Sequence, residues 1–215
     1  MSKVFSLQIK KSSSKKVNTF YDKAMEELKE FYQINWNENT PFIFLVDTRE
    51  DYDKLNGFKT EPWVVASVQQ NGILMLSPES YEKESIHKYS DDEYYSLIKH
   101  ELSHLFYNIF SKNNYYPVWL DEGFAIYSSG QLATKKKPKK LKKFLDYYSQ
   151  GGEGVYEESG FVVEGLIKKF GKEKVLEFVK LLSNVRGEKI FKEAFEKFFG
   201  LELSYESIQE LLQNL

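Results

Sequence analysis

Residues 90–110, SDDEYYSLIKHELSHLFYNIF, contain both a helix start and an unusual pair of histidines. The first four residues have the S-x-x-E form of a capping box, so we expect a helix that begins after Ser90 and runs to about Lys112. Within it, His100 and His104 are four residues apart, which places both imidazoles on one helix face, one turn apart. Two imidazoles in this arrangement can bind the same cation.

Two carboxylates extend this pattern. Glu101 lies about 100° around the helix from His100, where it can reach a water on a cation held by the histidines. After 17 further residues, His104 is followed by Glu122, within WLDEGFA at 119–125. Two histidines and one glutamate form a three-ligand zinc site whose fourth position is open, which is typical of catalytic zinc. The spacing therefore predicts a site for one Zn²⁺ ion.

The neighbours of Glu122 also have expected roles. Glycine is a poor helix former, so Gly123 in the middle of a helix indicates close packing against another element. Histidine ligands usually donate their second ring N–H to an acceptor, and Asp121 is one candidate for that acceptor.

The composition limits the chemistry that is available. The chain has 215 residues, 41% of them hydrophobic, with three histidines and no cysteine. It can form a sizeable core, which excludes general disorder. The lack of cysteine excludes disulfide scaffolds, thiolate zinc sites and cysteine nucleophiles. Any metal site must therefore combine very few histidines with carboxylates.

The charge and the hydropathy pattern bear on partners and location. The formal net charge of −2 gives no case for nucleic acid or membrane as the main partner. No apolar run reaches the length of a membrane span, and the first residues lack the apolar core of a signal peptide. We expect a cytoplasmic protein, or a secreted one if a leader has been removed.

The pattern along the chain predicts an α+β fold, with a small mixed sheet and its helices first and a helical bundle last. The apolar run Phe42–Val46 predicts a buried strand, and Asn71-Gly72 between two further runs is typical of a β-hairpin. Those two runs are Trp63–Gln69 and Ile73–Leu76. A further helix is expected to end near Gln150. The other expected helices lie near residues 18–32, 49–55, 90–112, 118–129, 156–170, 172–183, 187–199 and 204–213.

We expect a single domain over residues 17–215. Within it, residues 17–89 would form a sheet subdomain, 90–131 the zinc-binding helices and 132–215 the helical bundle. Residues 1–16 are rich in lysine and serine and are expected to form a loose arm or an edge strand. The glycines at 151–154 predict a flexible connector.

The segments HELSH and WLDEGFAIY together resemble those of the gluzincin zinc metallopeptidases, in particular the aminopeptidase N-like branch and the related small peptidase MA-like domains. The resemblance runs from about Pro41 to the end of the chain and implies a minimal thermolysin-like catalytic domain. It implies that His100, His104 and Glu122 bind zinc and that Glu101 is the general base. The metzincin pattern does not fit, because Tyr and Phe stand where it needs Gly and His.

The resemblance also implies how substrate is bound. Members carry a sheet edge beside the metal along which an extended substrate lies, and the runs 63–69 and 72–76 are the candidates for that edge. They also carry a tyrosine that supports the oxyanion, and Tyr156 in YEESGF matches it. The match departs at Ser159, where the family has glycine. The glycine-rich motif that anchors a free amino terminus in aminopeptidases is missing from 63–77.

The expected function is therefore zinc-dependent hydrolysis of peptide bonds in a peptide or protein substrate. The alternative is a non-catalytic zinc- or peptide-binding module derived from a metallopeptidase. His87 is a spare ligand, a substrate contact or an exposed loop histidine, and we favour the last of these. The lysine-rich run 135–143 is expected to be a solvated loop rather than a site for nucleic acid or anionic lipid.

Overall fold

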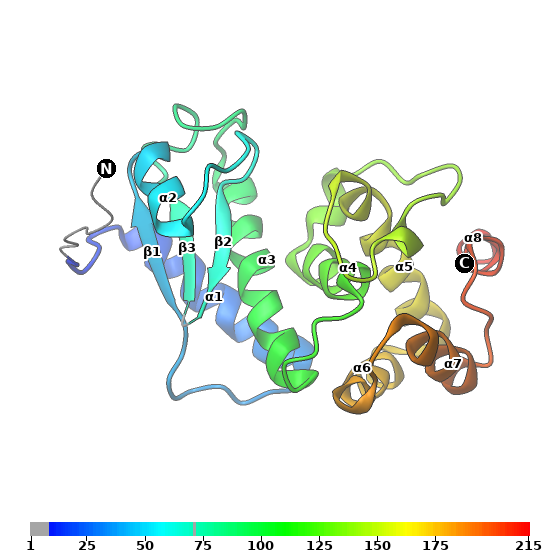
Figure 1. The fold of residues 1–215 in the computed structure, drawn as a ribbon. Coiled ribbons are helices and arrows are strands. Elements are labelled where there is room, and N and C mark those ends of the chain that lie inside the picture. Colours follow the sequence, from blue (N-terminus) through cyan, green and yellow to red (C-terminus); the bar gives the residue numbers. More distant parts are fainter. Residues whose placement is uncertain (1–8, 71) are drawn as a thin grey trace.

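The computed structural model describes residues 9–70 and 72–215, which form a mixed α/β fold. Figure 1 shows the three strands with α1, α2 and α3 in one half of the molecule and helices α4 to α8 in the other. The described helices and strands are α1 (Lys15–Tyr32), β1 (Phe42–Val46), α2 (Arg49–Asn56), β2 (Ala66–Gln69), β3 (Gly72–Leu76), α3 (Asp91–Phe110), α4 (Val118–Ser129), α5 (Glu153–Phe170), α6 (Lys172–Leu181), α7 (Glu188–Phe199) and α8 (Tyr205–Gln213). Short 3₁₀ helices lie at Gln131–Thr134, Phe144–Asp146 and Leu182–Asn184.

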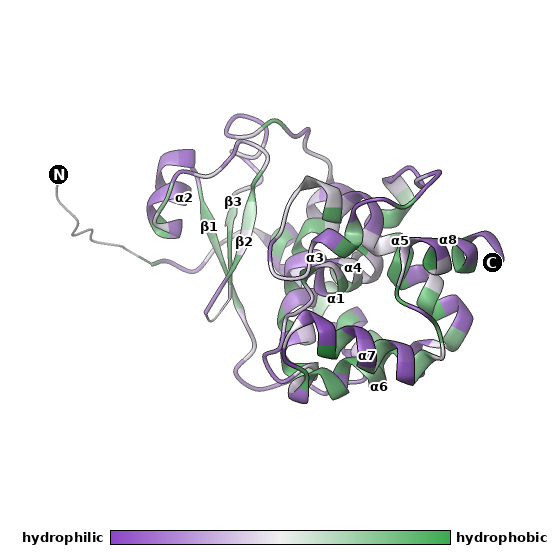
Figure 2. Ribbon diagram, turned by 45° about the vertical axis from the view of Figure 1, so that its right-hand side comes forward, coloured by the Kyte–Doolittle hydropathy of each residue, from purple (hydrophilic) through white to green (hydrophobic). Residues whose placement is uncertain are grey.

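The three strands form a mixed sheet in the order β1-β3-β2. Strand β1 runs parallel to β3, and β2 runs antiparallel to β3 with Gln69 opposite Gly72, so the predicted hairpin is present. Asn71, which was part of that prediction, lies outside the described residues. A side chain at Gly72 would collide with the backbone of Phe42, its partner on β1, which explains the glycine at this position. Figure 2 shows the strands in mostly hydrophobic colours and α2 as mainly hydrophilic.

Helix α3 lies between the sheet and α4 and contacts α1, β2, β3 and α4. Its start follows the predicted capping box, because the Ser90 side chain accepts a hydrogen bond from the backbone N–H of Glu93. A chain of buried hydroxyl groups joins three helices at this level. Ser128 on α4 donates to Ser103 on α3 at 2.8 Å, and the Ser103 hydroxyl also lies 2.8 Å from that of Tyr32 on α1. These bonds fix the register of α3 against α4.

Helices α4 and α5 approach each other closely at Gly123, as the sequence predicted. A Cβ atom at Gly123 would lie 2.6 Å from Cγ2 of Val163 and 2.7 Å from the backbone oxygen of Ser159. Only a residue without a side chain fits here, so the expected reason for this glycine is confirmed.

The lysine-rich segment differs from its prediction. The helix expected to end near Gln150 is wrong, because residues 135–150 contain only the short 3₁₀ helix Phe144–Asp146. The backbone N–H groups of Lys142, Lys143 and Phe144 all donate to the buried carboxylate of Glu158 on α5, at 2.9–3.0 Å. These donors are therefore not available for helical bonds, and a run of like charges also disfavours a helix.

Three smaller predictions also differ from the structure. Helix α1 begins at Lys15 and is capped by Ser14, so the last two residues of the expected arm are helical. Residues 9–14 form neither helix nor strand, and residues 1–8 lie outside the described residues. Helix α5 begins at Glu153, inside the expected connector. Strand β3 is the central strand, so it cannot provide the expected sheet edge, whereas β2 can.

No helix in the described part of the chain combines the length and the hydrophobicity needed to cross a membrane.

We expect Gly123→Ala to lower the free energy of unfolding by about 1–3 kcal/mol, because the added methyl group must push α4 away from α5. The measurement is urea unfolding followed by circular dichroism. Gly151→Ala is the control, since a Cβ there meets nothing within 4 Å. Equal stability of the two variants would contradict the close packing.

Candidate metal centre

One atom from each of three side chains converges at the crossing of α3 and α4. The Nε2 atoms of His100 and His104 lie 3.2 Å apart, and Oε2 of Glu122 lies 3.4 Å and 3.7 Å from them, respectively. Ligand atoms at zinc bond lengths around a tetrahedral ion are separated by about 3.3 Å. These three residues could therefore hold a metal ion without rearrangement, and they form the one such group found among the described residues.

The chemistry of the donor atoms also fits a cation. The Glu122 side chain is only 13% exposed, and its Oε2 atom is buried and accepts no hydrogen bond. A buried carboxylate oxygen without a partner is costly, unless a cation or a donor compensates for the lost solvation. The two Nε2 atoms face this oxygen, so a cation placed among them would satisfy all three groups.

Asp121 fixes the orientation and the tautomer of His104. The carboxylate can only accept, so Nδ1–H of His104 donates to Oδ1 of Asp121 at 2.9 Å. The Nε2 atom of His104 then faces His100 and Glu122, and its lone pair becomes available to a cation when Nε2 gives up its proton. Burial opposes a charge on His104, but the nearby carboxylates of Asp121 and Glu122 raise its pKa to about 10. The sequence named Asp121 as a candidate acceptor, and the contact is present.

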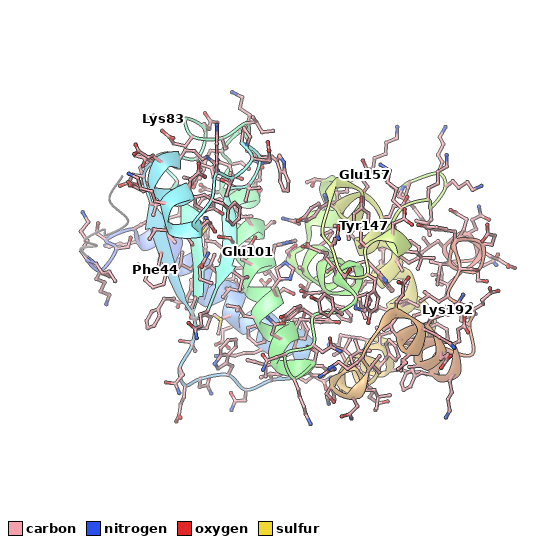
Figure 3. The ribbon with its side chains drawn as sticks, in the orientation of Figure 1. Phe44, Lys83, Glu101, Tyr147, Glu157 and Lys192 are labelled. Carbon is pink, nitrogen blue, oxygen red and sulfur yellow. The ribbon has the colours of Figure 1, made fainter. Side chains whose placement is uncertain are left out.

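Glu101 is buried in the middle of α3, the helix between the sheet and the α4–α5 pair (Figure 3), and is 8% exposed. Glu101 is not part of the converging group, so it is not a candidate metal ligand. Burial raises the pKa of its carboxyl group, while His100 and His104 act in the opposite direction. A carboxyl group with a raised pKa next to a cation site has the properties of a proton acceptor and donor.

Tyr156 at the start of α5 lies beside the same group. Its hydroxyl donates a hydrogen bond to Oε1 of Glu122 at 3.4 Å, which leaves Oε2 for the converging site. Burial and the nearby carboxylates of Glu122 and Glu101 raise the pKa of Tyr156, so it keeps its proton at neutral pH. The structure thus brings together all five residues that the sequence singled out for catalysis or metal binding.

His87 lies outside the centre. Its Nε2 atom is 2.8 Å from the backbone oxygen of Trp63, and its Nδ1 atom is 3.7 Å from Oε1 of Glu93. Because a carbonyl oxygen only accepts, Nε2–H is the donor. The role of spare ligand is therefore wrong, and His87 is a partly exposed histidine that binds a backbone carbonyl.

The sequence did not indicate several residues that surround the centre. Ser103 and Ser128, which form the hydroxyl chain, lie on the two helices that carry the converging side chains, α3 and α4. Lys135 is partly buried, and this burial lowers its pKa, although the nearby Glu122 carboxylate acts to raise it. Trp63 contacts Tyr156 with ring centroids 6.0 Å apart. No local signal predicts this contact, because the two residues lie on distant parts of the chain.

Comparison with known proteins adds no assignment: no family model, curated protein or solved structure matches this chain.

We expect Glu122→Ala to weaken zinc binding by more than about 100-fold, since losing a ligand should cost more than losing an outer hydrogen-bond partner, which costs about 10–100-fold. The measurement is competition with a fluorescent zinc chelator, with circular dichroism to show that the helices persist. Glu157→Ala on α5 is the control, because it removes an exposed carboxylate one residue from Tyr156. Unchanged zinc affinity would exclude Glu122 as a ligand.

We expect Asp121→Asn to weaken zinc binding by about tenfold, because the neutral amide oxygen still accepts from His104 but no longer stabilises its orientation through charge. The same competition assay measures the effect, with Asp92→Asn at the exposed start of α3 as the control. An affinity equal to that of the control would show that Asp121 does not support the ligand.

Proposed function

We propose that this protein is a zinc-dependent peptidase of the gluzincin type, with His100, His104 and Glu122 as ligands. The observation that carries the proposal is the convergence of two imidazole nitrogens and one unpartnered carboxylate oxygen within 3.2–3.7 Å. Three protein ligands leave one position of a tetrahedral zinc ion open, which is the arrangement of hydrolytic sites rather than purely structural ones. The thermolysin-like fold assignment is part of this proposal.

The other side chains supply the chemistry that amide hydrolysis needs. A zinc ion held by the three ligands would polarise an amide carbonyl and lower the pKa of a water molecule. Glu101, with its raised pKa, takes a proton from the attacking water and gives it to the leaving amine. Tyr156 keeps its proton, and its one O–H would have to leave Oε1 of Glu122 to donate to the carbonyl oxygen where negative charge develops.

The sheet offers a site for the substrate backbone. Strand β2 contacts α3, and within the described sheet only β3 pairs with it, so its other edge has free backbone groups. The side chains of Ser67 and Gln69 donate hydrogen bonds to Oδ1 of Asn56 on α2, so both lie on the face of the sheet that α2 covers. An extended peptide that pairs with β2 would lie beside α3.

The competing function is a module that binds zinc or peptide without hydrolysis. The same three ligands would serve it, but it has no use for a buried carboxyl group such as Glu101. Burying a carboxyl group destabilises the fold unless its environment compensates. The presence of Glu101 therefore favours the enzyme.

We expect Glu101→Gln to retain one zinc ion per chain and to reduce peptide hydrolysis by about 10²–10⁴-fold, because the amide cannot take up the proton. The measurements are metal analysis and mass spectrometry of a diverse peptide library. Glu177→Gln, an exposed position on α6, is the control.

Two outcomes would contradict the proposal. Equal hydrolysis by Glu101→Gln and the wild type would exclude Glu101 as the base. A wild type that holds stoichiometric zinc and cleaves no peptide of the library would favour the binding module.

A further inference from the structure

Trp63 is an exposed aromatic side chain that contacts the candidate centre from the sheet side. It is 44% exposed, and its ring packs edge-on against that of Tyr156, with centroids 6.0 Å apart and an interplanar angle of 69°. Tyr156 in turn donates to Glu122. Trp63 is thus two contacts away from a proposed metal ligand, while much of its surface remains open to solvent.

The backbone around Trp63 is held by side-chain donors from two other segments. The Arg49 guanidinium donates to the backbone oxygens of Pro62 and Val64, and also to that of Glu84. His87 donates from Nε2 to the oxygen of Trp63 itself, at 2.8 Å. Three consecutive carbonyl groups are therefore occupied, and this explains why the strand begins at Ala66 rather than at Trp63.

This fixation has a consequence for binding. A tryptophan whose backbone is already held loses less conformational freedom when a ligand packs on its ring, and a large flat ring offers much apolar area. Leaving that area exposed gives the folded chain no hydrophobic stabilisation. The rigid backbone and the exposed ring together are typical of a contact residue for a ligand.

The position of Trp63 relative to β2 indicates which ligand. Trp63 precedes the free edge strand by two residues, and Val65 extends the pairing with β3 by accepting from the N–H of Leu76. A peptide that pairs with β2 and reaches the metal centre would place a side chain next to the rings of Trp63 and Tyr156. Both rings are apolar over most of their surface, so a large apolar side chain fits best.

Resting on the proposed function, we propose that Trp63 is a specificity-determining residue that binds an aromatic or large aliphatic side chain of the substrate beside the scissile bond. His87 and Arg49 are positioning residues, since they act through the backbone of the 62–64 segment. This gives the third histidine of the chain a role that does not involve metal.

The test uses two probes that bind zinc and differ in one side chain, N-acetyl-phenylalanine hydroxamate and N-acetyl-alanine hydroxamate. Their dissociation constants are measured by calorimetry on the zinc-loaded full chain, so the result does not depend on turnover. The variants are Trp63→Ala, Trp63→Tyr and, as the control, Phe58→Ala. Phe58 is 66% exposed and, like Trp63, lies in the connection between α2 and β2.

We expect the wild type to bind the phenylalanine probe at least about tenfold more tightly than the alanine probe. The reason is that the phenylalanine ring would contact Trp63 and bury additional apolar area. In Trp63→Ala this ratio should fall to about 1 while the affinity for the alanine probe stays within about threefold. Trp63→Tyr, which keeps a ring, should give an intermediate ratio, and Phe58→Ala should keep the wild-type ratio.

The opposite results separate the two proposals. A wild type without preference, or a preference that survives Trp63→Ala, would overturn the role of Trp63 alone. A zinc-loaded protein that binds neither hydroxamate would overturn both this role and the proposed peptidase site. If Trp63→Ala lowers zinc occupancy or helix content, the folded Trp63→Tyr variant decides: an intermediate ratio would support the role of Trp63, and an unchanged ratio would overturn it.

The positioning role of His87 has its own test. His87→Gln keeps an N–H donor that can reach the Trp63 carbonyl, whereas His87→Ala removes it. We expect His87→Ala to reduce the probe ratio severalfold and His87→Gln to restore it. Equal ratios in both variants and in the wild type would show that His87 does not position Trp63.

Discussion

The structure depends on one arrangement of buried charges at the crossing of α3 and α4. The carboxyl groups of Glu101, Asp121 and Glu122 surround the imidazoles of His100 and His104, and all of these side chains are largely removed from solvent. Such a cluster is destabilising by several kcal/mol, unless a compensating charge is present. A dication among the two Nε2 atoms and Oε2 of Glu122 would balance the excess of carboxylates. A metal ion bound there, as proposed, would therefore help to stabilise this interior.

The surrounding packing keeps these groups in place. The hydroxyl chain from Tyr32 through Ser103 to Ser128 fixes α4 against α3, while Gly123 allows α5 to approach α4 from the opposite side. This close approach brings Tyr156 to Glu122, and so the position of one carboxylate depends on three helices. A change of a few tenths of an ångström in any of these contacts would alter the distances among the proposed ligand atoms, since close-packed interiors transmit strain.

Much of the site could be predicted from the sequence, because its main features are local. The capping box at Ser90 and the four-residue spacing of the histidines determine a helix and its face without any tertiary information. Gly123 indicated close packing for an equally local reason. The WLDEGFA segment added Glu122 through its spacing from His104, and the resemblance to gluzincins implied the same residue.

The rest depends on contacts between distant segments. Glu158 takes the backbone donors of residues 142–144 and so prevents the helix that the apolar spacing predicted. Similarly, the carbonyl groups near Trp63 are occupied by Arg49 and His87, which shortens β2 and orients a ring toward Tyr156. Neither effect has a signature in the local sequence, because the partners are brought together only by the fold.

X-ray absorption spectroscopy at the zinc edge can show whether two histidines and one glutamate bind a single zinc ion. For the full chain loaded with one equivalent of zinc, the account predicts a four-coordinate ion with two imidazole nitrogens and light oxygen donors at about 2.0–2.2 Å. In Glu122→Ala the imidazole signal of a two-histidine site should weaken or disappear. A spectrum without imidazole scattering, or one that is identical in both proteins, would contradict the account.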